Sequence, residues 1–201
     1  MEEGSAYNPL DKLNLGRSVV ETLLRQPEIP LGDVPALTGA GVYAIYYRGG
    51  FASYERIAEL NRAEGVLPIY IGKAVPKGAR KGVANPGRTK TSALYDRLRE
   101  HAASIRSVEN LELPDFTCRS LVVDDIWIPL GESLVIDRFR PLWNVVIDGF
   151  GNHDPGGPRH YGKRPRWDEI HPGRPWAAKC QPPKESCEQL LKMVALTLKS
   201  L

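Results

Sequence analysis

The chain contains 201 residues, of which 42% are hydrophobic and 25% charged, and its formal net charge is +3. These values are typical of one globular domain, which we place over residues 1–201. The sequence has neither the roughly 18 consecutive apolar residues that cross a bilayer nor a secretory leader, so we expect a soluble protein of the cytoplasm. Three cysteines at irregular spacing argue against a disulfide framework and against a structural zinc site.

The charged residues are grouped along the chain. Residues 68–106 hold nine lysines and arginines against two acids, residues 109–137 hold seven acids against one arginine, and residues 138–179 hold eight basic residues against four acids. Both basic regions are rich in glycine and proline, which indicates loops that can lie along a polyanion. Ordinary solvated surface cations are the alternative interpretation.

The first part of the chain predicts two helices and two strands. Apolar residues at helical spacing predict a helix over residues 13–26, which Pro27 ends. Aromatic and β-branched residues predict a strand over 41–48. A serine cap followed by apolar residues at helical spacing predicts a helix over 53–64, and a second short strand follows over 67–72.

Residues 73–90 predict a loop with two prolines, three glycines and six basic residues, too long for a simple connection. The helix predicted over 91–106 places Arg97 and His101 on one face, beside its buried stripe and not within it. The remaining predicted elements are strands over 116–123 and 126–128, a helix over 130–139, a strand over 143–147, a loop arm over 149–176 and a helix over 184–201.

Five features then follow one another in the sequence: GVY at 41–43, YIG at 70–72, Arg97 with His101, Glu132 near a helix start, and PLWN ending in Asn144. Each is weak alone, but in this order they resemble the GIY-YIG nuclease superfamily. The R-x3-H spacing and the GFGNHDPG segment resemble its type II restriction endonuclease branch. The resemblance covers about residues 41–150, the expected catalytic core. It implies an α/β (α+β) fold with a small antiparallel three-stranded sheet flanked by helices.

The resemblance also assigns site residues and a cofactor. The residues that match the motif positions are Tyr43, Tyr70, Arg97, His101, Glu132 and Asn144. Glu132 matches the metal-binding glutamate, which implies one Mg²⁺ per active site, with Mn²⁺ as a substitute. The sequence departs from the pattern in two places. Valine replaces isoleucine in the first motif, and 26 residues separate the two tyrosines, so that residues 48–67 form an insertion.

Phosphodiester hydrolysis needs a deprotonated water, cations beside the phosphate and stabilisation of the departing 3′ oxygen. We predict that Tyr43 takes the proton from water, with its phenolate favoured by Lys73 and by relay to His101. Arg97 is predicted to clamp the phosphate, because a guanidinium is always charged and can bond two oxygens. Glu132 is predicted to hold Mg²⁺, which needs only one or two protein carboxylates.

Three further residues have predicted supporting roles. Tyr70 should orient the nucleophile or the phosphate, Gly72 should leave room for the nucleic-acid backbone, and Asn144 should fix the loop geometry around Glu132. Simpler interpretations stand beside these. The tyrosines could be half-buried strand aromatics, the arginine and histidine a solvated helix face, the glutamate a partner of the helix dipole, and the asparagine a turn residue.

The two basic loops are the predicted contacts to double-stranded DNA. Their candidate cations are Lys77, Arg80, Lys81, Arg88, Lys90, Arg159, Lys163, Arg164 and Arg166. Most should contact phosphates, and Arg159, Arg164 and Arg166 are the candidates for contacts to bases. The resemblance implies a bacterial enzyme that acts as a homodimer on a GC-rich palindrome such as CCGCGG, with a cognate DNA methyltransferase in the same system.

Three other functions are compatible with parts of the sequence. The carboxylate-plus-lysine restriction fold finds acids in Asp115, Asp124 and Asp125, but no lysine lies between Lys90 and Lys163. A non-catalytic DNA-binding module would keep the shape without hydrolysis. A homing or repair nuclease could share the fold, although the chain has no appended domain of separate character.

Overall fold

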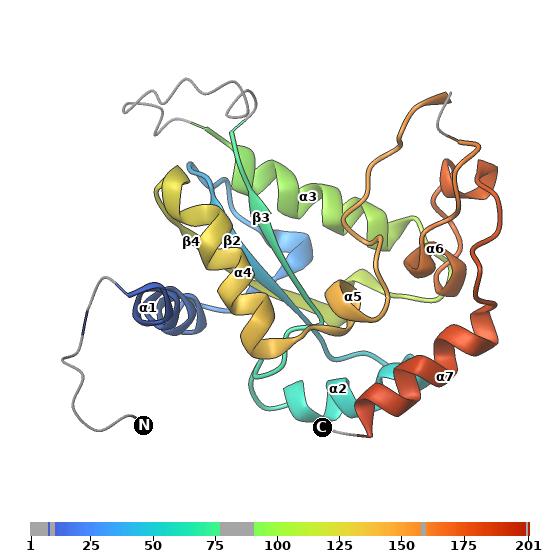
Figure 1. The fold of residues 1–201 in the computed structure, drawn as a ribbon, viewed down its shortest axis with the longest axis horizontal. Helices are drawn as coiled ribbons and strands as arrows, with labels where there is room; N and C mark the ends of the chain where they lie inside the picture. The colour runs from blue at the N-terminus through green and yellow to red at the C-terminus, as the bar shows by residue number, and fades with distance from the viewer. Residues whose placement is uncertain (1–7, 9–10, 77–90, 158–159, 200) are drawn as a thin grey trace.

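The computed structural model describes residues 8, 11–76, 91–157, 160–199 and 201, and in these residues four strands form one antiparallel sheet in the order β1-β4-β2-β3 (Figure 1). The strands are β1 (Ile29–Pro30), β2 (Gly41–Tyr47), β3 (Tyr70–Ala74) and β4 (Phe116–Val122). The predicted antiparallel α/β architecture is confirmed. The two-residue β1, which pairs with β4, adds a fourth strand to the three expected.

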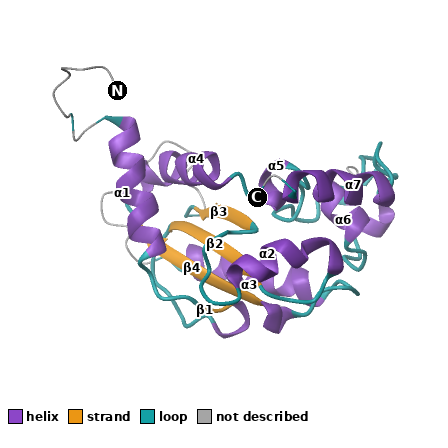
Figure 2. Ribbon diagram, turned by 90° about the horizontal axis from the view of Figure 1, so that it is seen from below, coloured by secondary structure: helices purple, strands orange, loops and turns teal. Residues whose placement is uncertain are grey.

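Helices cover both faces of the sheet (Figure 2). The α-helices of the described residues are α1 (Lys12–Leu24), α2 (Glu55–Asn61), α3 (Ala93–Arg106), α4 (Ile128–Phe139), α5 (Leu142–Val145), α6 (Arg166–Ile170) and α7 (Cys187–Leu198), of which α6 and α7 pack against each other beside the sheet. No helix in this part of the chain has the length and apolar character that a bilayer crossing requires.

All residues of the central strand β2 are buried, and their side chains alternate between two apolar clusters. Tyr43, Ile45 and Tyr47 belong to the larger cluster, with α2 and α3, whereas Val42 and Ala44 belong to the cluster of α1 and α4. The GVY motif is therefore part of the core. It is buried because both faces of β2 are covered.

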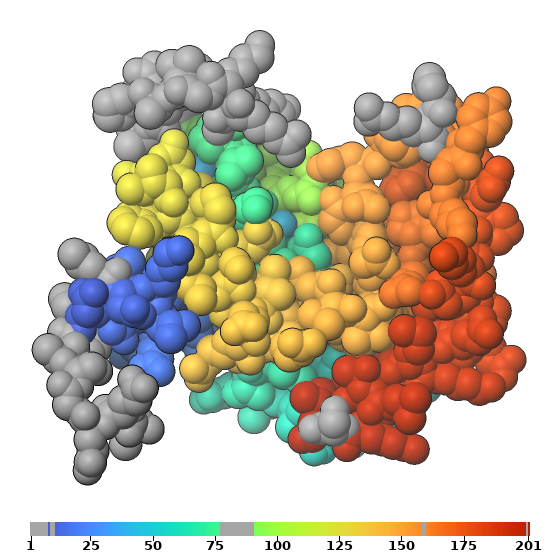
Figure 3. Space-filling model, in the orientation of Figure 1, coloured from blue at the N-terminus to red at the C-terminus, as the bar shows by residue number. Residues whose placement is uncertain are grey.

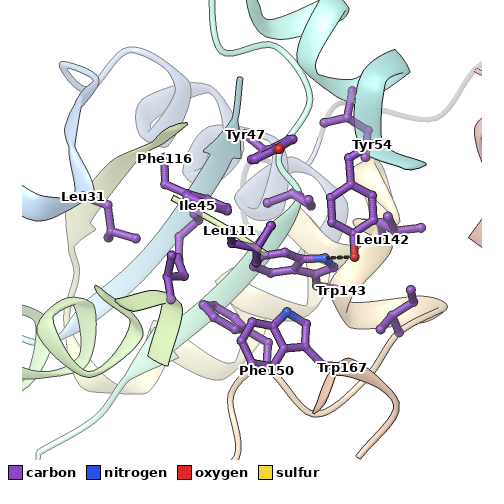
Figure 4. Packing of buried hydrophobic residues seen from close by; sticks show 14 of the residues in the cluster. Leu31, Ile45, Tyr47, Tyr54, Leu111, Phe116, Leu142, Trp143, Phe150 and Trp167 are labelled. Atoms are coloured by element: carbon purple, nitrogen blue, oxygen red, sulfur yellow. Dashed lines mark hydrogen bonds between the residues drawn. The ribbon is translucent and has the colours of Figure 1, made fainter. Parts of the chain in front are cut away.

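The larger cluster extends beyond the sheet into the last third of the chain (Figure 4). The Trp143 indole Nε1–H donates to the Tyr54 hydroxyl at 3.1 Å. The rings of Trp143 and Phe150 are 4.6 Å apart, and those of Phe150 and Trp167 are 5.0 Å apart. Residues 149–176 are thus not only a loop arm, since they contain α6 and contribute buried aromatic rings to the core.

Most predicted helices are found with small shifts in their ends. The predicted helix over 13–26 is α1, which Asp11 caps by accepting from the Leu13 backbone N–H at 2.8 Å. The helices predicted over 53–64, 91–106, 130–139 and 184–201 correspond to α2, α3, α4 and α7. The insertion over 48–67 therefore contains the predicted helix. The short 3₁₀ helix that precedes α2 contacts α7.

Three predicted strands are wrong in place or in type. The strand expected over 67–72 lies at Tyr70–Ala74, where it pairs with β2. Residues 125–127 form a 3₁₀ helix that leads into α4, because the Asp124 carboxylate accepts from the Ile126 N–H. The strand expected over 143–147 is the short helix α5, whose Val145 N–H bonds the Pro141 carbonyl at 3.0 Å.

Candidate active site

An open pocket of about 790 Å³ lies where β3, α3, α4 and the residues after Phe150 meet. Among the residues that line it are Tyr70, Lys73, Arg97, Glu100, Glu132 and His153. Figure 3 shows the surface hollowed in this region, between the green β3 and α3 and the orange segment that follows α5. The structure thus brings four of the predicted site residues to one pocket.

Tyr43 and His101 form a buried hydrogen-bonded pair below this pocket. The Tyr43 Oη and His101 Nε2 are 2.6 Å apart, and the Tyr70 ring lies against both, with centroids at 6.3 and 5.1 Å. Burial, and next the neighbouring Tyr70, raise the pKa of Tyr43 well above 10.0. Burial, and next Arg97, lower the pKa of His101 well below 6.5. Both groups are therefore neutral at pH 7, and one proton lies between the phenol oxygen and the imidazole Nε2.

The position of His101 corrects the sequence prediction. We expected it beside the buried stripe of α3, but it is one of the buried residues of that helix. The reason is a second covering layer. The Phe150 ring stacks on the imidazole, with centroids 4.5 Å apart and planes 19° apart. The buried face of α3 is thus wider than its own apolar residues indicate.

Gly72 makes room for Tyr43 and not, as predicted, for a nucleic-acid backbone. Residues 43 and 72 are directly paired across β2 and β3. A Cβ atom at position 72 would come within 2.5 Å of the Tyr43 Cζ and nearer still to Oη. The glycine of the YIG motif therefore leaves the space that the phenol ring of Tyr43 occupies over the neighbouring strand.

Arg97 lies at the wall of the pocket and is held by three partners. Its Nη1 donates to Glu100 Oε2 at 2.9 Å and lies 2.5 Å from His153 Nε2, while its Nη2 donates to the Gly151 carbonyl at 2.6 Å. The arginine also lies near the phenols. Burial raises the pKa of Tyr70, and the positive charge of Arg97 is the largest effect that acts in the opposite direction. This places a permanent cation between the pocket and the Tyr43–His101 pair.

Glu132 and Lys73 form an ion pair in the lining of the pocket. Lys73 Nζ is 2.6 Å from Glu132 Oε2. We predicted that Lys73 would favour the phenolate of Tyr43, but the structure pairs its ammonium with this carboxylate. Among the described residues, no charge therefore offsets the effect of burial, which keeps the pKa of Tyr43 well above 10.0. The role assigned to Lys73 is corrected accordingly.

The Glu132 carboxylate is compatible with the predicted binding of one Mg²⁺. It opens into the pocket, and one of its oxygens is engaged by Lys73. Within the described residues, no group of three or more His, Cys, Asp or Glu side chains could enclose a metal. A single carboxylate suits Mg²⁺, which keeps several waters and takes phosphate oxygens as ligands.

Asn144 binds the catalytic strand and not the surroundings of Glu132. Its Oδ1 accepts from the Ile71 N–H at 2.8 Å, and its Nδ2 donates to the Ile71 carbonyl at 2.7 Å. The amide thus satisfies both backbone groups of the central residue of the YIG motif on the edge that β2 does not use. The predicted loop-fixing role is replaced by a strand-fixing one.

The candidate DNA-binding cations divide into two groups. Lys77, Arg80, Lys81, Arg88, Lys90 and Arg159 lie outside the described residues, while Lys163, Arg164 and Arg166 are described. Pro76 and Thr91, the described residues that flank the first basic segment in the sequence, both line the pocket.

Two of the three predicted base-reading arginines are engaged within the protein. Arg164 Nη1 is 3.0 Å from Glu169 Oε2, and Arg166 Nη2 is 2.6 Å from Glu185 Oε1. These ion pairs disfavour base contacts by Arg164 and Arg166. Lys163 is exposed.

Sequence reasoning missed the residues that contact Arg97 and His101 from the segment after α5. Phe150, the Gly151 carbonyl and His153 all belong to the GFGNHDPG segment, which in the sequence indicates only the restriction endonuclease branch. The segment itself was the signal. A backbone carbonyl and a stacked ring have no spacing pattern in the sequence, so their contacts become visible only in the fold.

Comparison with known proteins agrees with this geometry. The family model described as the Eco29kI GIY-YIG domain matches residues 36–198, a range that includes all six motif residues, the segment after α5 and the whole of α7. A comparison with curated proteins finds no match. The match covers well over half of the chain, and it favours a GIY-YIG fold over the carboxylate-plus-lysine restriction fold. The chain therefore belongs to the Eco29kI family of GIY-YIG domains, in the restriction-endonuclease branch of the GIY-YIG nucleases.

Proposed function

We propose that the protein is a Mg²⁺-dependent, site-specific deoxyribonuclease that hydrolyses both strands of a palindromic double-stranded DNA site. The observation that carries this proposal is the meeting of Arg97, Tyr70, Lys73 and Glu132 at one pocket, directly above the hydrogen-bonded Tyr43 and His101. Family membership supports a restriction-type nuclease, and these side chains supply the groups that phosphodiester hydrolysis needs.

Arg97 and Tyr70 bind and orient the scissile phosphate. Both side chains line the pocket, and the Arg97 guanidinium is charged at every relevant pH. A phosphate that enters the pocket competes with Glu100 and His153 for the Nη1 donors, because its oxygens are strong acceptors. Binding of DNA would thus exchange contacts that the arginine already makes for contacts to substrate.

Tyr43 takes a proton from the nucleophilic water while it passes its own proton to His101. The 2.6 Å hydrogen bond provides the path for that second transfer. In the free protein the transfer is unfavourable, since burial moves the two pKa values in opposite directions, away from neutrality. The bound phosphate changes this balance, because its negative charge offsets Arg97 and favours an imidazolium at His101. Base formation is therefore coupled to the presence of DNA.

Glu132 would hold the metal ion beside the ammonium of Lys73. When bound, Mg²⁺ supplies positive charge to the phosphate and to the departing 3′ oxygen. Lys73 keeps one carboxylate oxygen of Glu132 fixed at 2.6 Å and so orients the group in the free protein. Lys73 also lines the pocket and contributes positive charge there.

A plasmid assay tests the function. Supercoiled DNA incubated with Mg²⁺ should be cut to discrete linear fragments, and EDTA should prevent cutting. Glu132→Ala should abolish cleavage and keep DNA binding, while Glu188→Gln, an exposed change on α7, serves as the matched control with unchanged cleavage. DNA binding without any cleavage would instead support a non-catalytic module, and persistent cleavage by Glu132→Ala would remove Glu132 from the metal site.

Mapping the cut ends on a phage genome would give the recognition site, the stagger and the symmetry together, with CCGCGG as the first sequence to test. A symmetric site with both strands cut supports a homodimer that places one active site on each strand. The mass of the protein–DNA complex in solution checks this directly. Nicks or asymmetric sites would favour a homing or repair nuclease, for which no cognate methyltransferase is expected.

A further inference from the structure

The turn formed by residues 149–153 is packed against both catalytic side chains. Phe150 is buried and stacks on the His101 imidazole. The next residue, Gly151, accepts a hydrogen bond from Arg97 Nη2 through its carbonyl at 2.6 Å. His153 Nε2 lies 2.5 Å from Arg97 Nη1. Any force that fixes this turn therefore also fixes the guanidinium and the imidazole of the site.

A single buried arginine from a distant part of the segment fixes this turn. Arg174, only 4% exposed, donates Nη1 to the carbonyls of Phe150 and Asn152 at 3.1 and 3.0 Å, and Nη2 to the carbonyl of Gly149 at 2.9 Å. These three carbonyls surround Gly151, whose own carbonyl is left for Arg97. The guanidinium thus binds the backbone on both sides of the group that contacts the active site.

The remaining donors of Arg174 are also used. Its Nε donates to Asp168 Oδ1 at 2.6 Å, and its Nη2 pairs with Asp168 Oδ2. All five N–H groups of the guanidinium therefore have acceptors. The cation also lies over the rings of Trp167 and Trp176, 4.7 and 4.8 Å from their centroids. Removing a charge from water is costly, and the hydrogen bonds, the ion pair with Asp168 and the two indole rings compensate that cost.

We propose that Arg174 is a positioning residue for the catalytic groups. By binding the carbonyls of residues 149, 150 and 152, it sets the place of the Gly151 carbonyl that orients Arg97 and of the Phe150 ring that covers His101. The segment after α5 is then part of the catalytic apparatus and not only a contact to DNA. This role rests on the proposed nuclease function, because Arg97 and His101 are taken as the reacting groups.

Arg174→Lys tests the proposal, since lysine keeps the charge but presents three donors in place of a planar fork of five. We expect single-turnover cleavage at saturating protein to fall by about 100-fold, as small displacements of catalytic groups do. DNA affinity in EDTA should change by less than about threefold, because Arg174 is buried away from substrate. A cleavage rate within about threefold of wild type would overturn the proposal.

Chemical rescue and a stability control separate positioning from simple folding support. Arg174→Ala should regain cleavage with millimolar guanidinium but not with ammonium at equal ionic strength. Val20→Ala removes buried methyl groups from the cluster on the opposite face of the sheet. It should lower the melting temperature and leave the cleavage rate unchanged. If both Arg174 variants fail to fold, Asp168→Asn gives the same test with a smaller expected loss, and an unchanged rate there would count against the role.

A measurement without DNA distinguishes this proposal from the proposed function. The imidazole ¹⁵N resonances of His101 should shift in Arg174→Lys and stay in place in Val20→Ala. If the wild-type protein cleaves no DNA, the nuclease function fails, while a shift at His101 still supports the link from Arg174 to the site. Unmoved His101 resonances in a folded Arg174→Lys protein would overturn that link, whether or not DNA is cleaved.

Discussion

In the free protein, the Tyr43 phenol is held in its protonated form. Its hydroxyl is buried, its pKa is raised well above 10.0 mainly by burial, and its hydrogen-bond partner His101 is held neutral by burial and by Arg97. A protonated phenol next to a neutral imidazole cannot deprotonate water effectively. In the proposed mechanism, a reactive base arises only when a phosphate joins the pair.

Tyr43→Phe should therefore abolish the base and leave the fold in place, since phenylalanine fills nearly the same space in the core. We expect single-turnover cleavage to fall by about 10²- to 10⁴-fold, the usual contribution of a general base. Quenched-flow cleavage of a labelled duplex measures the rate. Tyr95→Phe on α3 is the matched control and should cleave normally. A Tyr43→Phe protein with a normal rate would exclude the phenol from proton transfer.

Gly72→Ala makes a complementary test of the same ring. A Cβ at position 72 would overlap the Tyr43 phenol, so either the ring or β3 must move. Overpacking of this kind costs about 1–3 kcal/mol of unfolding free energy, and we expect cleavage to fall at least tenfold. Gly50→Ala is the control, because no atom lies within 4 Å of its added Cβ. Urea unfolding and the cleavage assay together check the prediction, which a neutral Gly72→Ala would contradict.

At the scale of elements, the position of β3 depends on α5 as well as on the sheet. β3 is an edge strand, and on its outer side the Asn144 amide bonds both backbone groups of Ile71. The outer backbone N–H and carbonyl of Ile71, which a further strand would otherwise bind, are thus hydrogen-bonded by a side chain. This contact joins the YIG motif to the asparagine that lies 73 residues later in the sequence.

Asn144→Ala should loosen that edge. Two hydrogen bonds are lost and two backbone groups are left without these partners, which together cost about 1–3 kcal/mol of unfolding free energy. Urea denaturation measures the change, and hydrogen exchange at the Ile71 amide should become faster. Asn14→Ala, which removes an exposed side-chain hydrogen bond on α1, should cost far less. Equal stability of Asn144→Ala and wild type would show that the amide does not hold the strand.

The elements that the sequence predicted correctly are those with a long periodic pattern. The apolar stripes of α1, α3, α4 and α7 extend over several turns, and the aromatic and β-branched run of β2 is bounded by glycines. The short apolar run at 143–147 is equally compatible with a strand and a helix, and Pro141 at the N-terminus of α5 decides between them. Such a run has no periodicity long enough to separate the two.

The site was predictable to the extent that its residues carry a motif. The order of the tyrosines, Arg97, His101 and Glu132 located the pocket, but local spacing misplaced three interactions. Lys73 pairs with Glu132, Gly72 admits the Tyr43 ring, and Asn144 binds Ile71. Each of these depends on strand register or on a contact between distant elements. Neither quantity is encoded in the spacing of residues along one helix or strand.

At the scale of the whole molecule, buried neutral histidines link stability to pH. Burial lowers the pKa of His171 to about 3. Its Nε2 lies 2.7 Å from the Tyr54 hydroxyl and its Nδ1 lies 2.8 Å from Asn110 Oδ1, while Trp143 donates to Tyr54. This chain of bonds is complete only with a neutral imidazole. His101 is the second case, since burial also lowers its pKa well below 6.5.

The unfolding free energy should therefore decrease as pH falls below about 6.5. Between that value and the folded pKa, each of these histidines binds a proton only in the unfolded chain, so stability is present above pH 6.5 and is lost on acidification. The slope is about 1.4 kcal/mol per pH unit for each histidine. Urea titrations at about pH 7.5, 6 and 5 measure it, above the range where most carboxylates titrate.

Two variants test whether the pH dependence of the unfolding free energy comes from the buried histidines. His171→Gln should remove about half of it, because one of the two buried neutral imidazoles is gone. Val20→Ala should lower the unfolding free energy equally at every pH, since it changes no titrating group. A stability that stays flat between pH 7.5 and 5 in the wild-type protein would mean that these histidines already bind protons in the fold.

The insertion that carries α2 joins β2 and β3 beyond Tyr47 and before Tyr70 (Figure 1). The register of the two strands, with residue 43 opposite residue 72 and residue 45 opposite residue 70, sets how far apart the phenols lie. Distance in space is thereby independent of distance along the chain. A connection of another length would therefore leave the paired phenols in place, provided that the strand register is kept and the core positions of Tyr54 and Ile57 are still filled.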